Sequence, residues 1–125
     1  MAFNIRYYGL IMLACLVWQS PSYATDFFES LYDVPILLDL EEIPEKALVF
    51  DKPSGRIARS AAYSSHNEEA VLQAYHQALP EMGWQKLSET DFRRKDEILS
   101  ISIIKSDTSS QSKISVEFSL KPAEE

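Results

Sequence analysis

Two segments near the C-terminus alternate apolar and polar residues with a period of two, and this pattern constrains the fold more than any other feature of the chain. Such alternation is typical of antiparallel strands that bury one face and leave the other in water. The inward positions are Leu99, Ile101 and Ile103 in the first segment, and Ile114, Val116, Phe118 and Leu120 in the second. The sequence therefore predicts an antiparallel sheet with one apolar face.

One amphipathic helix is predicted over residues 66–79. Apolar residues recur there at helical spacing, and polar residues occupy the other side. The run Ser65-His66-Asn67-Glu68 matches a capping box, with Ser65 as the cap. Pro80 and Gly83 are expected to end the helix, Gly83 by taking a left-handed turn. Helix and strands together predict a buried core of Val71, Leu72, Tyr75, Leu79, Leu99, Ile101, Ile103, Ile114, Val116 and Phe118.

Shorter segments complete the predicted sheet. Residues 47–50 and 56–63 read as two strands joined by a turn at Lys52-Pro53-Ser54-Gly55. Residues 84–88 and 92–94 read as a further pair. The predicted fold is a two-layer α+β domain, in which one antiparallel sheet, with elements in the order ββαβββ, is covered by the amphipathic helix.

The first 24 residues have the layout of a secretory signal peptide. Arg6 precedes an uncharged apolar run from Tyr7 to Trp18, and small residues lead to a cleavage site between Ala24 and Thr25. The run is shorter than the roughly 20 residues that a membrane-spanning helix needs. We therefore expect a periplasmic or secreted protein with no stable membrane span after cleavage. The alternatives are an uncleaved N-terminal anchor and a lipoprotein attached through Cys15.

The chain after the signal divides into an apolar arm (25–46), an α+β domain (47–121) and a short tail (122–125). The arm is too apolar to remain in solvent. We expect it to wrap the sheet of its own domain, the alternative being that it is offered to a partner.

Charge and cysteine content exclude several functions. Loss of Arg6 with the signal leaves 11 basic and 19 acidic residues, a net charge of −8 (11 − 19), which opposes nucleic-acid binding. The basic run Arg93-Arg94-Lys95 is flanked by acidic residues and reads as a solvated hairpin. Cleavage also removes the one cysteine, so the mature chain has no disulfide, thiolate metal site or cysteine nucleophile.

No constellation of residues predicts catalysis. The serines form neither a GxSxG elbow nor an SxxK pair. His66 and His76 lie ten positions apart, about 280° around a helix, so joint metal ligation is not expected. The acidic arm lacks the glycine-punctuated loop of an EF-hand. We expect no enzyme activity, no metal and no cofactor.

Three motifs follow one another along the chain: Phe50-Asp51-Lys52-Pro53-Ser54-Gly55-Arg56-Ile57, Val71-Leu72-Gln73-Ala74-Tyr75 and Leu79-Pro80-Glu81-Met82-Gly83-Trp84. With Val34-Pro35 upstream, the chain resembles a group of short exported bacterial proteins of unknown function that share FDxPxGRI-like and YxxxLPxxGW elements. The resemblance covers about residues 33–120. It implies a location in the bacterial envelope and no established activity.

Three residues are candidates for interaction: Arg56, Tyr75 and Trp84. Tyr75 and Trp84 are large enough to pin the helix to the sheet while keeping a polar tip for water or a partner. The alternative is a groove there that holds a peptide or lipid. Arg56 and Arg59 fall on opposite faces of a strand. We expect Arg56 to be exposed or to pair with an arm carboxylate such as Asp33 or Asp39, clamping the arm.

The sequence thus predicts a non-catalytic binding or accessory protein of the envelope, acting on an envelope protein partner. Such a protein-interaction module would show an exposed sheet edge or an apolar patch. The alternatives are a small lipid or peptide carrier, which needs an apolar pocket between helix and sheet, and an unrecognised enzyme, which needs a cleft with converging polar groups.

Overall fold

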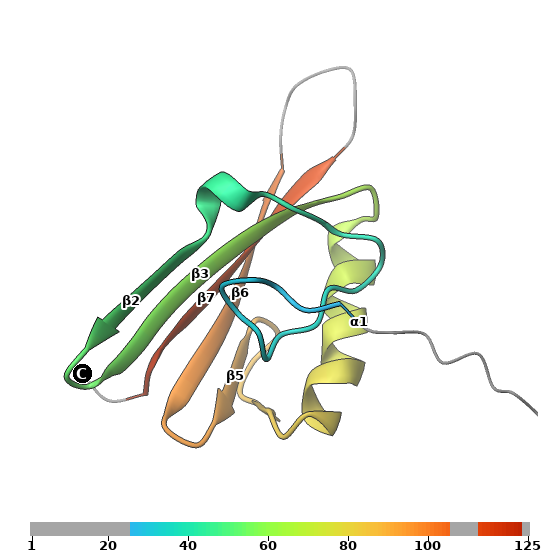
Figure 1. Ribbon diagram of the computed structural model, residues 1–125. Coiled ribbons are helices and arrows are strands. Elements are labelled where there is room, and N and C mark those ends of the chain that lie inside the picture. Colours follow the sequence, from blue (N-terminus) through green and yellow to red (C-terminus); the bar gives the residue numbers. More distant parts are fainter. Residues whose placement is uncertain (1–25, 106–112, 124–125) are drawn as a thin grey trace, which may run out of the picture.

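A seven-stranded antiparallel sheet and one α-helix form the α+β fold seen in the computed structural model, which describes residues 26–105 and 113–123 (Figure 1). The predicted cleavage site at Ala24–Thr25 and the alternative lipidation of Cys15 lie outside the described residues. The elements in chain order are β1 (Glu41–Glu42), the 3-10 helix η2 (Pro44–Lys46), β2 (Leu48–Lys52), β3 (Gly55–Ser64), α1 (Glu68–Glu81), β4 (Gln85–Lys86), β5 (Asp91–Arg94), β6 (Glu97–Lys105) and β7 (Ile114–Pro122).

The strands lie in the order β1-β3-β7-β6-β5-β4, and β2 also pairs with β3. Both β1 and β2 occupy the edge of β3 that faces away from β7, β1 opposite Ala62 and Tyr63 and β2 opposite residues 55–59. The predicted order ββαβββ was therefore wrong, because three strands precede the helix and four follow it. The additional strands β1 and β4 have two residues each, too few to show a period.

The long central strands confirm the alternation. In register, Phe118 lies between Ser60 of β3 and Ile101 of β6, so the side chains of all three residues share one face, here called the core face. The opposite face, here called the open face, carries the intervening residues such as Ser119 and Lys121. Phe118 and Ile101 are buried, which places the hydrophobic core on the core face.

The predicted hairpin is confirmed, with β2 and β3 joined at Lys52 and Gly55. Gly55 has a φ of 138°, which side chains rarely adopt, and a Cβ there would lie 3.0 Å from Pro122 Cγ. The backbone conformation therefore favours glycine at this turn, and a side chain there would also force Pro122 to shift.

The helix begins later than the capping box predicts. Asn67 is the N-cap, and its Oδ1 accepts a 2.8 Å hydrogen bond from the backbone N–H of Ala70. Ser65 is therefore not the cap. An asparagine oxygen two residues further on reaches the third amide of the helix equally well, and local sequence alone does not choose between them.

The helix also ends later than predicted, because it contains Pro80 and ends at Glu81. The N–H of Trp84 donates to Leu79 O at 3.1 Å and that of Gly83 to Pro80 O at 3.2 Å, the pair of bonds of a Schellman motif. Gly83 adopts the predicted positive φ, 92°. Pro80 is tolerated in the last turn because these two bonds hold the helix end after it.

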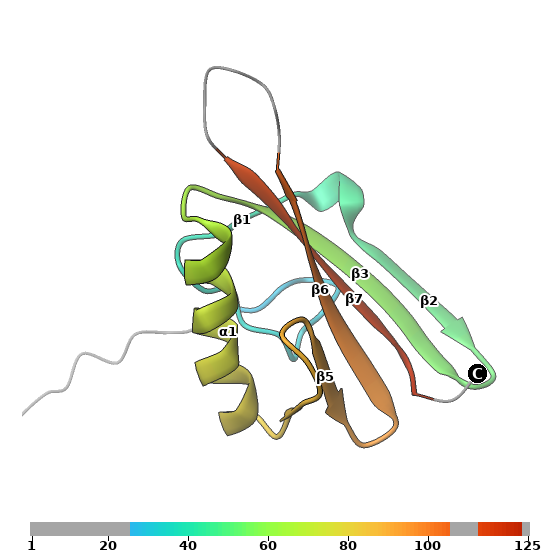
Figure 2. The same ribbon diagram turned by 180° about the vertical axis from the view of Figure 1, so that it is seen from behind.

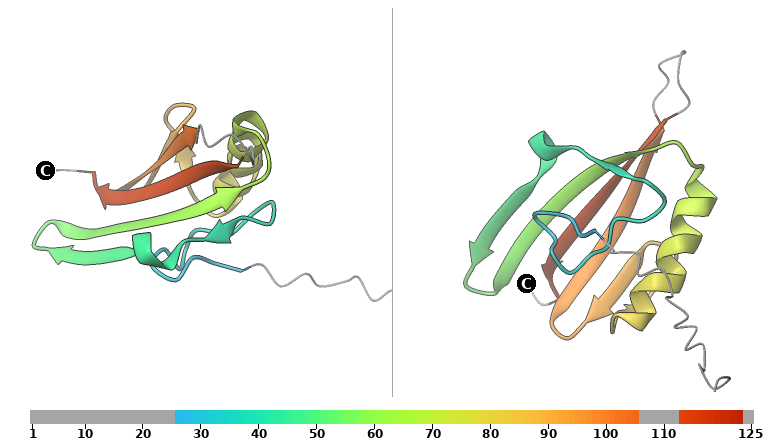
Figure 3. Two further views of the ribbon diagram at one scale, coloured as in Figure 1. Left: turned by 90° about the horizontal axis from the view of Figure 1, so that it is seen from above. Right: turned by 45° about the vertical axis from the view of Figure 1, so that its right-hand side comes forward.

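The second layer consists of α1 and the arm together, not of the helix alone (Figure 3). The ring of Phe118 contacts Tyr75 of α1 at 5.0 Å between centroids and Phe28 of the arm at 4.9 Å. A helix about 10 Å in diameter spans roughly two strands at 4.7–4.9 Å spacing. One helix was therefore too narrow to cover this sheet, as the two-layer prediction required.

The arm folds back on its own domain, as expected. Its residues Phe28, Leu31, Val34 and Leu40 belong to the buried core. Backbone bonds shape it into a compact loop, since Phe28 N–H donates to Val34 O at 3.2 Å and Ile36 N–H to Asp26 O at 2.7 Å. The predicted core was otherwise correct except for Leu72 and Ile103, which are only partly buried at its margin.

The position of the cap gives a direct test. Replacing Asn67 with Ala should lower the free energy of unfolding by about 1 kcal/mol, because the N–H of Ala70 loses its acceptor. Ser65→Ala, two residues away, should change it by less than about 0.5 kcal/mol. Urea unfolding followed by circular dichroism measures both variants. A larger loss of unfolding free energy for Ser65→Ala than for Asn67→Ala would show that Ser65 is the N-cap, as the capping box predicts.

Candidate functional site

A cluster of charged residues fastens the arm to the sheet, here called the Asp33 cluster. It consists of Asp33 from the arm, Arg56 at the start of β3, Arg94 at the end of β5 and Glu97 at the start of β6. Arg94 and Glu97 are cross-strand neighbours, while Asp33 comes from a turn closed by a 2.8 Å bond from Val34 N–H to Leu31 O. Four separate segments of the chain therefore meet at one point.

A single oxygen of Asp33 holds both arginines. Asp33 Oδ2 accepts a 3.0 Å hydrogen bond from Arg56 Nη2 and another from Arg94 Nη2. Arg56 also lies 3.5 Å from Glu97 Oε2. The side chains of Asp33 and Arg56 are only 13% and 17% exposed, so water screens their interaction less than that of a surface pair.

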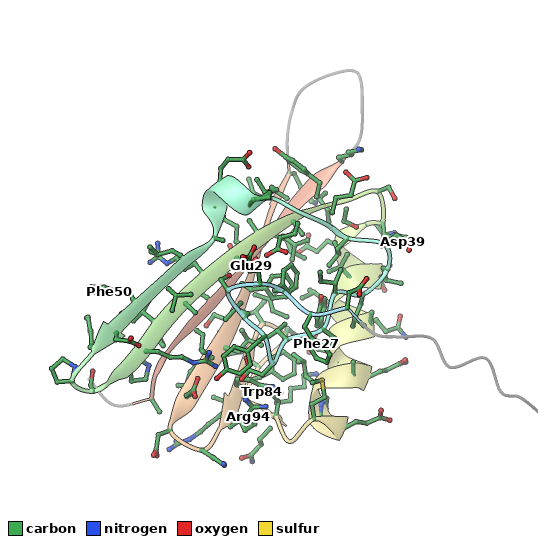
Figure 4. The ribbon with its side chains drawn as sticks, viewed as in Figure 1. Phe27, Glu29, Asp39, Phe50, Trp84 and Arg94 are labelled. Atoms are coloured by element: carbon green, nitrogen blue, oxygen red, sulfur yellow. The ribbon has the colours of Figure 1, made fainter. Side chains whose placement is uncertain are left out.

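Aromatic rings cover the two arginines. The guanidinium of Arg56 lies 4.7 Å from the ring centroid of Tyr32. That of Arg94 lies 4.4 Å from the ring centroid of Trp84, and Figure 4 labels both residues. Both distances are those of cation–π contacts. Asp33 Oδ1 and Trp84 Nε1 are buried and have no hydrogen-bond partner among residues 26–105 and 113–123.

The electrostatics keep Arg56 charged. Burial by itself would lower the pKa of its guanidinium, but the negative charges of Asp33 and Glu97 raise it, and the net shift is upward. The predicted pairing of Arg56 with an arm carboxylate is confirmed for Asp33. The alternative partner, Asp39, is exposed and lies outside the cluster.

Arg94 corrects the interpretation of the Arg93-Arg94-Lys95 run as a solvated hairpin. Arg93 and Lys95 are exposed, but Arg94 is half-buried on the core face and bonded to Asp33. A signal for this was present in the sequence, because in a strand Arg94 shares a face with the apolar Phe92. Its partner lies 61 residues earlier, and no local pattern points to it.

Tyr75 and Trp84 connect parts of the fold. Both are buried, and the hydroxyl of Tyr75 donates a 2.7 Å hydrogen bond to Pro35 O in the arm. Burial raises the pKa of the Tyr75 phenol. This geometry agrees with the prediction that Tyr75 and Trp84 pin the helix to the sheet. Because both residues are buried, neither offers an exposed surface to a partner.

His66 and His76 line one open hollow beside the N-terminal half of α1, contrary to the argument from helical rotation. That argument fails because His66 precedes the helix. His76 Nε2 lies 2.7 Å from Glu89 O. Within the described part of the chain, no group of three or more His, Cys, Asp or Glu side chains is placed to hold a metal ion.

Strand β2 is the most exposed apolar element of the described structure. All five of its residues are exposed, including Leu48 (50%), Val49 (56%) and Phe50 (51%). One side of β2 pairs with β3, and its other side pairs with no strand in the described ranges. The hairpin projects away from α1 and the arm, and Phe50 lies on this projecting part (Figures 1 and 4).

No protein-family model matches the chain, and no curated protein or solved structure is detectably similar to it. The resemblance to short exported bacterial proteins therefore stays a prediction. In the part of the chain that the structure describes, no helix combines the length and apolar character needed to cross a membrane.

The Asp33 cluster gives a prediction about the arm. Asp33→Asn keeps the side-chain shape but removes the charge that two half-buried arginines share, so it should lower the free energy of unfolding by about 1–3 kcal/mol. Limited proteolysis should also cleave the arm faster. The control is Asp39→Asn, an arm residue whose side chain is exposed and whose positive φ of 55° asparagine tolerates. Equal stability and equal protection of both variants would show that the cluster does not hold the arm.

Proposed function

We propose that this protein is an exported, non-catalytic accessory protein of the bacterial envelope, which binds a partner protein along strand β2. The observation that carries the proposal is the exposure of Leu48, Val49 and Phe50 on a strand with one unpaired edge. An exposed apolar edge was the feature expected of a protein-interaction module.

The physics of sheet edges supports this mode of binding. Alternate residues of an edge strand direct their N–H and C=O groups outward, where an added strand satisfies them. Natural proteins usually protect such edges with short strands, charges or a covering segment. In β2 only the end is charged, at Asp51 and Lys52, and three consecutive apolar residues precede it. In strand addition the main-chain bonds supply affinity and the alternating side chains supply specificity.

The carrier alternative has less support. The hollow beside α1 is lined mostly by polar and charged residues, with Leu72 and Ile114 as its apolar members. A lipid or apolar peptide pocket is expected to be lined chiefly by hydrophobic side chains. The position of Tyr75 and Trp84 inside the core also gives no support to a ligand groove between helix and sheet.

Export rests on the first 24 residues and yields a separate prediction. The apolar run is too short to span a bilayer and leads to small residues before the expected site, so the exported protein should begin at Thr25. Intact-mass measurement and N-terminal sequencing of the protein from the periplasmic fraction check this. Retention of Met1 would indicate an uncleaved anchor, and a lipid on Cys15 would indicate a lipoprotein; either result contradicts the prediction.

The β2 edge is tested by cross-linking in intact cells. A photo-reactive amino acid in place of Val49 should give one discrete protein adduct, whose identity mass spectrometry establishes. Adding Phe50→Lys should reduce the adduct about tenfold or more, because a strand pairing there would bury a charge beside apolar residues.

Leu87→Lys is the matched control, since Leu87 has the same exposure as Phe50 (51%) and lies outside the strands. It should leave the adduct unchanged. Absence of any adduct from position 49, or equal losses in the two lysine variants, would contradict binding at β2.

A further inference from the structure

Three cations lie on the open face of the sheet, on strands β3, β7 and β5. Arg59 of β3 shares this face with Leu48 and Phe50 of β2. Lys121 of β7 and Arg93 of β5 share it as well, because both are register partners of Ile98 on β6. Figure 2 shows this face from behind, and no helix crosses β6 and β7 in that view. Arg59, Arg93 and Lys121 are here called the cationic patch.

The three residues of the cationic patch have no carboxylate partner within residues 26–105 and 113–123. Arg93 Nε donates to the backbone oxygen of Lys95, at 3.3 Å, and the side chains of Arg59 and Lys121 make no ion pair with any residue that the structure describes. Six other cations each lie within 4.0 Å of a carboxylate: Lys46, Arg56, Lys86, Arg94, Lys105 and Lys113.

The carboxylates nearest in register are already engaged. Asp91 accepts hydrogen bonds from Ser100 Oγ at 2.6 Å and from Ser88 Oγ at 3.2 Å. Glu117 pairs with Lys46. In a chain with 19 acidic residues and 12 basic ones, a group of cations without ion-pair partners on one face favours an anionic partner.

Apolar residues lie between these cations. Passing from β2 to β5, the open face carries Phe50, Ile57, Lys121, Ile98 and Arg93, each on the next strand. At 4.7–4.9 Å per strand this row is about 19 Å long. The surface thus offers apolar contact and positive charge in alternation, and it is continuous with the edge strand.

We propose that the cationic patch and the apolar residues beside it bind an acidic, partly apolar segment of the partner protein. The inference rests on the proposed function, since the open face adjoins the β2 edge, and it defines the chemistry of the partner. A bound segment that follows β2 places its side chains beside Leu48 and Phe50, where a glutamate can reach Arg59 on the adjacent strand β3. Lys121 and Arg93 lie further across the open face, on β7 and β5, and contact the part of the segment that continues over that face.

A protein segment fits better than an anionic membrane. Charges separated by more than the Debye length, about 8 Å at physiological ionic strength, are largely screened, so a short segment experiences mainly the local positive patch. A bilayer faces the whole acidic molecule, and recruitment to anionic lipid usually involves four to eight clustered basic residues. The cationic patch has three.

The test uses ¹⁵N-labelled protein, purified as cells export it, and two short peptides that alternate valine with glutamate or with lysine. The glutamate peptide should bind at least about tenfold more tightly than the lysine peptide and should weaken with salt. Its addition should shift amide signals in β2, β3 and β7. Vesicles of phosphatidylglycerol and phosphatidylcholine form the second arm and should not bind.

Arg59→Gln with Lys121→Gln should weaken binding of the glutamate peptide about tenfold, from two exposed ion pairs lost together. The matched control, Lys86→Gln with Lys105→Gln, removes the same charge from core-face positions and should change affinity less than about twofold. Equal affinity for both peptides, equal losses in both double variants, or vesicle binding that depends on Arg59 and Lys121 would overturn the inference.

Phe50→Lys separates the inference from the proposed function. If both peptides bind equally and Phe50→Lys abolishes both, the β2 edge stands and the acidic preference fails. Binding of the glutamate peptide could instead require Arg59 and Lys121, leave the β2 amide signals unshifted and be unaffected by Phe50→Lys. In that case the acidic preference stands and binding at the β2 edge is contradicted. If both proposals hold, we expect Phe50→Lys and the Arg59/Lys121 double variant each to weaken binding of the glutamate peptide.

Discussion

The width of the core face is the constraint on which the rest of the structure depends. Seven strands present an apolar surface that one helix of 14 residues covers only in part. The remainder must be covered because exposed apolar area costs roughly 25 cal/mol per Å². The arm supplies the missing cover with Phe28, Leu31 and Val34, and Phe118 is packed from both sides of the second layer. The arm is therefore part of the domain's core.

Covering a sheet with an irregular segment creates a second requirement, since an arm with little regular structure has few backbone bonds to hold it. The Asp33 cluster meets this requirement with charge. One carboxylate binds arginines from β3 and β5, and aromatic rings cover both cations. Partly buried charges of this kind stabilise little in net terms but are costly to leave unpaired, so they favour one position of the arm over others. The hydrogen bond from Tyr75 to Pro35 adds a connection between arm and helix.

The same architecture explains why the candidate binding surface lies where it does. Arm and helix both occupy the core face, whereas the open face keeps exposed residues such as Phe50, Arg59 and Lys121, and within the described ranges no strand pairs with the free edge of β2. Arg56 and Arg94 on the core face are paired with Asp33, whereas Arg59, Arg93 and Lys121 on the open face have no carboxylate partner among the described residues. The proposed binding surface and the residues that hold the arm thereby lie on opposite faces of one sheet.

The sequence by itself determined the elements whose pattern is local. The alternation in β6 and β7, the buried helix face with Val71, Tyr75 and Leu79, and the Gly55 turn all follow from period and conformation, which need no distant partner. It also put Arg56 and Arg59 on opposite faces of one strand, and offered an arm carboxylate as a partner for Arg56 if that residue was not exposed. Tertiary structure alone decided that Asp33 and not Asp39 is the partner, and that Arg94 shares it. It also decided that β1 and β4 join the sheet and that β2 stays at an edge. These outcomes depend on which segments of the chain pair with one another over long sequence separations. A strand of two residues or a single charged residue has no periodic pattern from which such a pairing could be predicted.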